Sequence, residues 1–274
     1  MARKTATRKI LSLSGGKDSA ALAIYLKDKV PDLEYVFCDT EKELPETYEY
    51  LSMLESFLGK RITVLKHDGR DFDHWLVIYN NYLPSPQARW CTKHLKLAPF
   101  ERYIGNDKVI NYIGIRADED REGYISHKPN IKAEYPFKED GITKEDVIRI
   151  LEESGLGLPK YYSWRSRSGC YFCFFQQKIE WVGLLENHPD LFEQAMKYEK
   201  TDSSTGRRFT WTEGESLKEL SQPDRIARIK DDYYGRIEAM KNCSKYLRSN
   251  LLSTVFSEID GDEDYRRPCL ICTL

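Results

Sequence analysis

The sequence predicts an α/β fold: a doubly wound, mainly parallel sheet followed by a mostly helical, cysteine-bearing C-terminal part. Apolar, β-rich runs alternate with helical patterns through the first half, which is typical of parallel strands joined by helical crossovers. A glycine-rich turn, SGGKDS at residues 14–19, joins the first apolar run directly to a helical stretch of small residues. Beyond Pro136 the alternation stops, and helical patterns prevail from Gln176 to about Leu247.

Four strands and three helices are expected in the first half. The strands are Lys9 to Ser14, Leu33 to Asp39, Ile62 to Lys66 and Val109 to Ile115, and the helices are Ser19 to Lys29, Pro45 to Leu58 and Thr92 to Tyr103. Ligands of open parallel sheets bind beyond the carboxyl ends of the strands. The 14–19 turn, Asp39-Thr40 and Gly114-Ile115-Arg116 all follow expected strands, so these loops should converge on one edge.

The 14–19 turn has the composition of an anion site. A strand that turns tightly into a helix exposes unpaired N–H groups at the positive end of the helix dipole, which attracts phosphates. Gly15 and Gly16 allow close approach of the backbone, and Lys17 adds a positive charge. An ordinary glycine turn, in which Asp18 or Ser19 caps the helix, remains the alternative.

Composition and charge set limits on the class of protein. The 274 residues include 42 basic and 44 acidic side chains, so the total charge gives no reason to expect unspecific nucleic-acid binding. No stretch approaches the eighteen or so apolar residues of a membrane span, and the N-terminus has no signal-peptide apolar core. We therefore expect a cytoplasmic protein with no membrane partner.

Seven cysteines in such a chain indicate metal ligands or reactive thiols before disulfides. Four form two C-x-x-C pairs, Cys170 with Cys173 and Cys269 with Cys272, and two such pairs can complete a tetrahedral zinc site. That arrangement would leave Cys91 as a free nucleophile. The remaining two, Cys38 and Cys243, are expected to be small buried apolar residues.

Aromatic and basic residues alternate at 160–167, just before the first cysteine pair. Rings that stack on bases and guanidinium groups that contact phosphates are what a nucleic-acid groove requires. The same residues are equally suited to brace a metal-binding loop against the sheet, and both interpretations stay open here. A capping-box pattern at Thr143 to Asp146 predicts a further helix that ends near Gly155.

The SGGKDS turn resembles the PP-loop of the ATP pyrophosphatase superfamily, whose members cleave ATP between the α and β phosphates. A Walker A loop is excluded because Leu11 replaces its first glycine and Asp18 follows the lysine. Further segments resemble, in order, the landmarks of the phosphoadenosine-phosphosulfate reductase-like family over roughly residues 9–200. These segments are Arg89 to Lys96, Gly114 to Glu119 with Arg121, Tyr135-Pro136, and Ser168 to Cys173.

The resemblance implies a fold of the adenine nucleotide alpha hydrolase-like type and a set of site residues. It implies a nucleotide-binding α/β domain at 1–160 and a metal- or cluster-binding, mostly helical region at 161–274 packed on it. ATP with Mg²⁺ would be bound, with Arg116 facing the substrate; exposed salt bridges to the nearby acidic residues are the alternative for Arg116. The expected nucleotide-binding residues are Ser12, Ser14, Gly15, Gly16, Lys17, Asp18, Ser19, Asp39, Thr40, Gly114 and Arg116.

The cysteines also resemble the pattern of family members that carry a [4Fe–4S] cluster. In those members the first ligand position is a Cys-Cys dipeptide, whereas Trp90 precedes Cys91 here. Cys91, Cys170 and Cys173 would then be ligands, with Cys269 or Cys272 as the fourth. We favour this cluster over structural Zn²⁺ because thiolates suit iron–sulfur centres and no histidine joins the set.

The resemblance implies an ATP-dependent adenylation of an acceptor, with release of pyrophosphate, followed by sulfur transfer. Lys17, Asp18, Cys91 and Arg116 are the expected catalytic residues. DNA backbone phosphorothioation is the favoured reaction, with a cysteine desulfurase as sulfur donor and other subunits of a modification system as partners. The alternatives are tRNA thiolation, reduction of phosphoadenosine phosphosulfate or adenosine phosphosulfate, and a non-enzymatic nucleotide-sensing or nucleic-acid-binding subunit.

Overall fold

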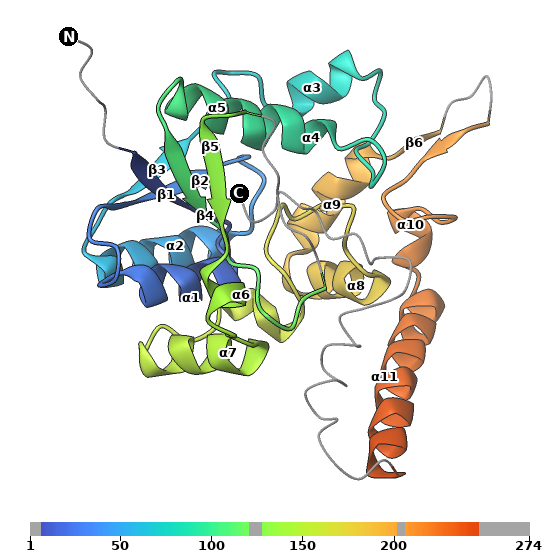
Figure 1. Ribbon diagram of the computed structural model, residues 1–274. Helices are drawn as coiled ribbons and strands as arrows, with labels where there is room; N and C mark the ends of the chain where they lie inside the picture. The colour runs from blue at the N-terminus through green and yellow to red at the C-terminus, as the bar shows by residue number, and fades with distance from the viewer. Residues whose placement is uncertain (1–6, 121–127, 202–205, 247–274) are drawn as a thin grey trace.

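The computed structural model describes residues 7–120, 128–201 and 206–246, with side chains up to residue 239. Its centre is a five-stranded sheet in the order β3-β2-β1-β4-β5, in which every neighbouring pair is parallel (Figure 1). The strands are β1 Arg8–Leu13, β2 Leu33–Cys38, β3 Ile62–Leu65, β4 Val109–Tyr112 and β5 Ile131–Glu134. The chain leaves β1 toward one edge and returns to β4 on the other side, so the predicted doubly wound α/β fold is confirmed.

Helices cover both faces of the sheet (Figure 1). On one face lie α1 Lys17–Leu26, α2 Pro45–Leu58 and α7 Lys144–Glu153, and on the other α5 Ala98–Ile104. The first face is packed with aliphatic side chains such as Leu11, Leu22 and Leu54, all fully buried. The predicted capping box is present at the start of α7, where the Thr143 and Asp146 side chains each bond the other's backbone.

The cysteine-bearing half has a core of its own, built mainly from aromatic rings. Its elements are η2 Lys160–Ser163, α8 Lys178–Asn187, α9 Pro189–Tyr198, β6 Lys200–Thr201, β7 Arg208–Phe209, α10 Leu217–Leu220 and α11 Pro223–Tyr246. Phe172, Trp181 and Trp211 are at the centre of this core. Phe72 of α3 Phe72–Ile78 and Trp90 of α4 Trp90–Thr92 pack into it from the first half of the chain. The boundary at 160/161 stays a prediction.

Several elements differ from the expectation. The helix expected at Thr92 to Tyr103 is divided into α4, a π-helical turn η1 Lys93–Leu97, and α5. The short α6 Pro136–Glu139 was not expected, and the β6–β7 pair interrupts the helical C-terminal part. Among the helices of the described ranges, none is both long and apolar enough to span a bilayer.

Candidate functional site: a phosphate loop beside a cysteine pocket

The 14–19 loop joins β1 to α1, as predicted: residues 14–16 connect the two elements, and residues 17–19 form the first turn of α1, which begins two residues earlier than expected. Gly15 has φ +72°, a left-handed conformation that favours glycine, and a Cβ there would lie 2.5 Å from Thr47 Cγ2. A Cβ on Gly16 would lie 2.7 Å from Ser168 Oγ. A side chain at position 15 would meet both a strained backbone and Thr47, whereas a side chain at position 16 would have to displace the Ser168 hydroxyl.

The serines of the loop stabilise its shape. Ser19 Oγ accepts a hydrogen bond from Ser14 N at 3.1 Å and donates one to Gly16 O at 3.2 Å. Ser12 has a different place: it is buried in β1, and its Oγ bonds Asn111 Oδ1 of β4 at 3.3 Å. Ser12 thus links β1 to β4. The strands before β4 were added on one side of β1, and β4 and β5 lie on the other side.

The charged residues of the loop form one network with Arg116. Asp18 lies 3.2 Å from Lys17 Nζ and 2.9 Å from Arg116 Nη1. Burial alone would raise the pKa of the Asp18 carboxyl, but the positive charges of Lys17 and Arg116 outweigh burial and lower this pKa to about 2. Arg116 is itself buried and also pairs with Asp118 and Glu119, at 2.9 Å each.

These contacts place Arg116 beside the 14–19 turn, whereas its expected role of facing a substrate stays a prediction. It faces the phosphate loop through Asp18, and it is also an ion-pair partner of the acidic residues beside it. Gly114 packs against the loop from the same segment, since a Cβ there would lie 3.0 Å from Asp18 O. The loop that follows β4 therefore meets the loop that follows β1, as the topology predicted.

The loop after β2 meets the cysteine-bearing segment. Asp39 Oδ1 accepts hydrogen bonds from Glu41 N and the Tyr48 hydroxyl, both at 2.8 Å. Thr40 Oγ1 donates to Glu43 Oε1 at 3.0 Å and lies 3.1 Å from Cys170 Sγ. Thr40 and Glu43 thus connect the segment that follows β2 to the first C-x-x-C pair.

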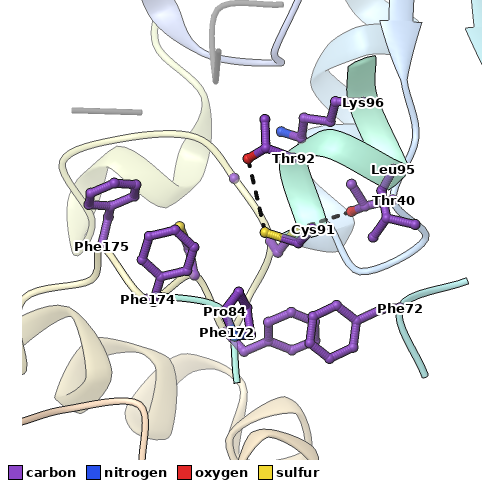
Figure 2. A pocket seen from close by; sticks show the side chains of 13 residues that line it. Thr40, Phe72, Pro84, Cys91, Thr92, Leu95, Lys96, Phe172, Phe174 and Phe175 are labelled. Atoms are coloured by element: carbon purple, nitrogen blue, oxygen red, sulfur yellow. Dashed lines mark hydrogen bonds between the residues drawn. The ribbon is translucent and has the colours of Figure 1, made fainter. Parts of the chain in front are cut away.

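Three of the five candidate metal ligands line one pocket. Figure 2 shows aromatic side chains on one side of Cys91, with Thr92 and Lys96 on the other. Cys170 and Cys173 complete the sulfur-bearing wall. Burial is the main reason that the pKa of the Cys170 thiol lies well above its usual value. The thiol is therefore protonated near neutral pH in this arrangement.

The pocket does not by itself make a metal site. Within residues 7–120, 128–201 and 206–246, no three histidine, cysteine or acidic side chains are arranged to hold a metal ion. The other two candidate ligands, Cys269 and Cys272, lie outside the described residues, as do Arg121 and the side chain of Cys243. Both the iron–sulfur cluster and the zinc site stay predictions, whereas Cys38 is buried as expected.

A segment that the sequence did not assign to the nucleotide site contacts the phosphate loop directly. The Tyr161 hydroxyl donates to Gly15 O at 2.7 Å, and Lys17 N donates to the Tyr162 hydroxyl at 3.1 Å. Ser168 Oγ bonds Ser14 Oγ at 3.2 Å. These residues lie about 150 positions from the loop in sequence, so no local spacing could have revealed the contacts.

The basic and aromatic residues at 160–167 are largely used inside the protein. Arg165 is buried and donates to Gly169 O at 3.0 Å and to Cys170 O at 2.9 Å, so this arginine braces the cysteine loop. Lys160, in contrast, is exposed and pairs with Glu49. The bracing interpretation thus holds for Arg165, and a nucleic-acid role for the segment stays a prediction.

Residues 8–139 match the family described as phosphoadenosine phosphosulfate reductase domain. An uncharacterised protein of Methanocaldococcus jannaschii is 26% identical over 198 residues, which are 67% of this chain and 45% of that protein. The chain thus spans less than half the length of this relative.

Two solved structures are similar at low identity. The phosphoadenylyl-sulfate reductase of Candida auris, in a phosphate complex, is 14% identical with a TM-score of 0.49, over 63% of this chain and 85% of that one. The U34-tRNA thiolase NcsA of Methanococcus maripaludis, with its [4Fe–4S] cluster, is 15% identical with a TM-score of 0.42, over 70% and 72%. The matched range, residues 8–139, holds the five-stranded sheet and the 14–19 turn, so this part of the chain is similar to a phosphoadenosine phosphosulfate reductase domain.

Proposed function

We propose that this protein is an ATP pyrophosphatase that adenylates an acceptor and then supports sulfur transfer to it. The contact between the phosphate loop and the cysteine segment is the observation that carries this proposal. Ser14 bonds Ser168 at 3.2 Å, and Thr40 lies 3.1 Å from Cys170 Sγ. A nucleotide held at the loop would therefore react next to a pocket lined by three thiols.

In the first step, an acceptor oxygen attacks the α-phosphorus of ATP, and the bond to the bridging oxygen of the β-phosphate breaks. Lys17 and the loop amides stabilise the negative charge that develops on the leaving pyrophosphate. Asp18 positions Lys17 and Arg116 through its two ion pairs. Mg²⁺, when bound with the nucleotide, would supply positive charge that offsets the negative charge of the phosphates.

In the second step, a sulfur nucleophile displaces AMP from the adenylated acceptor. Cys91 is the thiol proposed to act nearest this step, because it lines the pocket with Cys170 and Cys173. The proposed sulfur source is a cysteine desulfurase, which would deliver the sulfur as a persulfide. The outer sulfur of the persulfide displaces AMP, and a second thiol then cleaves the S–S bond, which leaves the sulfur on the acceptor and forms a disulfide. Other subunits of a modification system would be further partners. A DNA backbone phosphate is the proposed acceptor, and a tRNA base is the second choice.

An iron–sulfur cluster held by Cys91, Cys170, Cys173 and one cysteine of the 269–272 pair is proposed separately. No step above depends on it. Anaerobic purification followed by visible spectroscopy and elemental analysis tests this proposal. A brown, iron-containing protein supports the cluster, whereas a colourless, zinc-containing protein supports the structural zinc alternative and removes the cluster.

The adenylation proposal is tested by measuring AMP and pyrophosphate released from ATP in the presence of DNA, RNA or neither. We expect equal amounts of the two products and a loss of at least about 10²-fold in the Lys17→Ala variant, which removes a preorganised charge. Lys9→Ala is the matched control, because Lys9 lies on β1, the strand that leads into the loop, but pairs with Asp32 away from the loop. ATP binding without pyrophosphate under all conditions would favour the nucleotide-sensing or nucleic-acid-binding alternative.

A reductase is the second candidate, because the matching family is the one described for phosphoadenosine phosphosulfate reductase. In that reaction a cysteine thiolate attacks the sulfur of the nucleotide sulfate, and sulfite is the final product. Incubation with phosphoadenosine phosphosulfate or adenosine phosphosulfate and reduced thioredoxin tests it. Sulfite formation that the protein catalyses over many turnovers would favour the reductase function over adenylation.

A further inference from the structure

We infer that Tyr162 is a phosphate-contacting residue, whose hydroxyl group donates a hydrogen bond to the pyrophosphate portion of the bound nucleotide. The inference rests on the proposed function and extends it by one residue. It starts from the position of the Tyr162 hydroxyl, which accepts a hydrogen bond from Lys17 N at 3.1 Å. Lys17 is the first residue of α1, so this hydroxyl lies at the helix end where a phosphate would bind.

The ring of Tyr162 is held in place by its neighbours. It stacks on the ring of Tyr161 with centroids 4.9 Å apart, and Tyr161 is fully buried and bonded to Gly15 O. The Lys17 ammonium lies 5.3 Å from the centroid of the Tyr162 ring. Because these contacts restrict the ring, we expect the Tyr162 hydroxyl to stay beside Lys17 N when a phosphate binds.

The chemistry of the group suits this role. A phenol that accepts a hydrogen bond from an amide can still donate its own hydrogen to another acceptor. Desolvation raises the pKa of Tyr162 above its ordinary value, so the group is protonated near neutral pH. A hydrogen bond from this hydroxyl to a phosphate oxygen would be charge-assisted and stronger than a bond between neutral groups.

The position also separates Tyr162 from its neighbour. The Tyr161 hydroxyl donates to a backbone carbonyl and therefore has a structural role in holding the loop. The Tyr162 hydroxyl meets a backbone N–H, which is the group that an anion would meet. Tyr161 thus bonds a carbonyl of the loop and Tyr162 bonds an N–H of the loop, which makes Tyr162 the tyrosine suited to contact the nucleotide.

The test compares Tyr162→Phe with the intact protein by calorimetric titration with inorganic pyrophosphate, ATP and adenosine. We expect Tyr162→Phe to weaken pyrophosphate and ATP binding by about 10-fold, the scale of one charge-assisted hydrogen bond, and to leave adenosine binding unchanged. The control is Tyr50→Phe, which also removes a tyrosine hydroxyl bonded to the backbone, in this case to Gly157 O, but away from the loop. It should not change any of the three affinities.

The outcomes separate this inference from the proposed function. If the intact protein binds pyrophosphate and Tyr162→Phe binds it equally or more tightly, the hydroxyl does not contact phosphate and the inference alone is overturned. If adenosine binding falls by the same factor, Tyr162 has only a structural role, which also overturns it. Failure of the intact protein to bind pyrophosphate or ATP would overturn both the inference and the proposed function.

Discussion

The two halves of this molecule are packed with different kinds of side chain. The face of the sheet covered by α1, α2 and α7 is filled mainly by aliphatic residues, all of them from the sheet half of the chain. The cysteine-bearing half is filled by aromatic rings that come from distant positions, including Phe72, Trp90, Phe172 and Trp211. The first core is therefore built within the sheet half, including α7 against α1, whereas the second draws its rings from both halves of the chain.

The comparison explains where the candidate site lies. The phosphate loop belongs to the sheet, and the cysteine loop belongs to the aromatic core. They meet through side-chain contacts of Ser14 with Ser168 and of Thr40 with Cys170. A change that loosens the aromatic core should therefore disturb the site even where no residue of the sheet has been changed.

The largest expected effect is that of Phe72→Ala. Phe72 is 1% exposed, and its ring lies 4.4 Å from that of Phe172 and 5.0 Å from that of Trp90. Its removal should lower the free energy of unfolding by about 3–5 kcal/mol, because a cavity remains among rings that cannot collapse. Chemical denaturation measures this change. A loss below about 1 kcal/mol would show that the aromatic half does not depend on α3.

Much of the sheet half could be predicted from the sequence because its signals are local. The strands expected at 9–14, 33–39, 62–66 and 109–115 correspond to β1 to β4, and the helix at 45–58 corresponds to α2. The fifth strand was missed because Ile131-Lys132-Ala133-Glu134 has too few apolar residues to stand out. Tertiary pairing with β4, rather than propensity, makes this segment a strand.

The site was predictable only in part, for the same physical reason. Loops at the carboxyl ends of parallel strands must converge, so the meeting of Lys17, Asp18 and Arg116 followed from the order of elements. The contacts of Tyr161, Tyr162 and Ser168 with the loop depend on how the aromatic half folds back over the sheet. No periodicity or spacing in the sequence indicates these long-range contacts.

A second prediction concerns the sheet side of the meeting point. Gly15→Ala should destabilise the protein by about 2–3 kcal/mol, since φ +72° is strained for alanine and the new Cβ would lie 2.5 Å from Thr47 Cγ2. Gly59→Ala is the matched control, because Gly59 has φ +63° but open space around it. Thermal unfolding should show a larger decrease in stability for Gly15→Ala than for Gly59→Ala. Equal decreases would mean that the contact with Thr47 does not contribute.

The third prediction concerns pH. The pKa of Asp18 is lowered to about 2 in the folded protein, below its ordinary value of 3.8, so its ion pairs stabilise the fold above about pH 4. This contribution is lost as the pH falls from about 4 to 2, and it amounts to about 2 kcal/mol. The difference in free energy of unfolding between the intact protein and Asp18→Asn should narrow by that amount over this range. A constant difference would contradict the depressed pKa.

The smallest effect is expected at the surface, where Lys160 of the cysteine-bearing half pairs with Glu49 of α2 at 3.0 Å. Both side chains are largely exposed, so solvent screens their attraction. Lys160→Ala should change the free energy of unfolding by less than about 0.5 kcal/mol. A double-mutant cycle with Glu49→Ala measures the pair itself, and a coupling above about 1 kcal/mol would mean that charge pairs, not ring packing, join the two halves.

The central claim is that the loop at residues 14–19 holds the phosphates of a nucleotide directly beside the cysteine pocket. A crystal structure with the non-cleavable analogue α,β-methylene-ATP tests it most directly. We predict the outer phosphates on the amides of the loop and next to Lys17, with the α-phosphorus turned toward the pocket that contains Cys91. A nucleotide bound elsewhere, or a loop still closed by its own side chains at saturating analogue, would contradict the account.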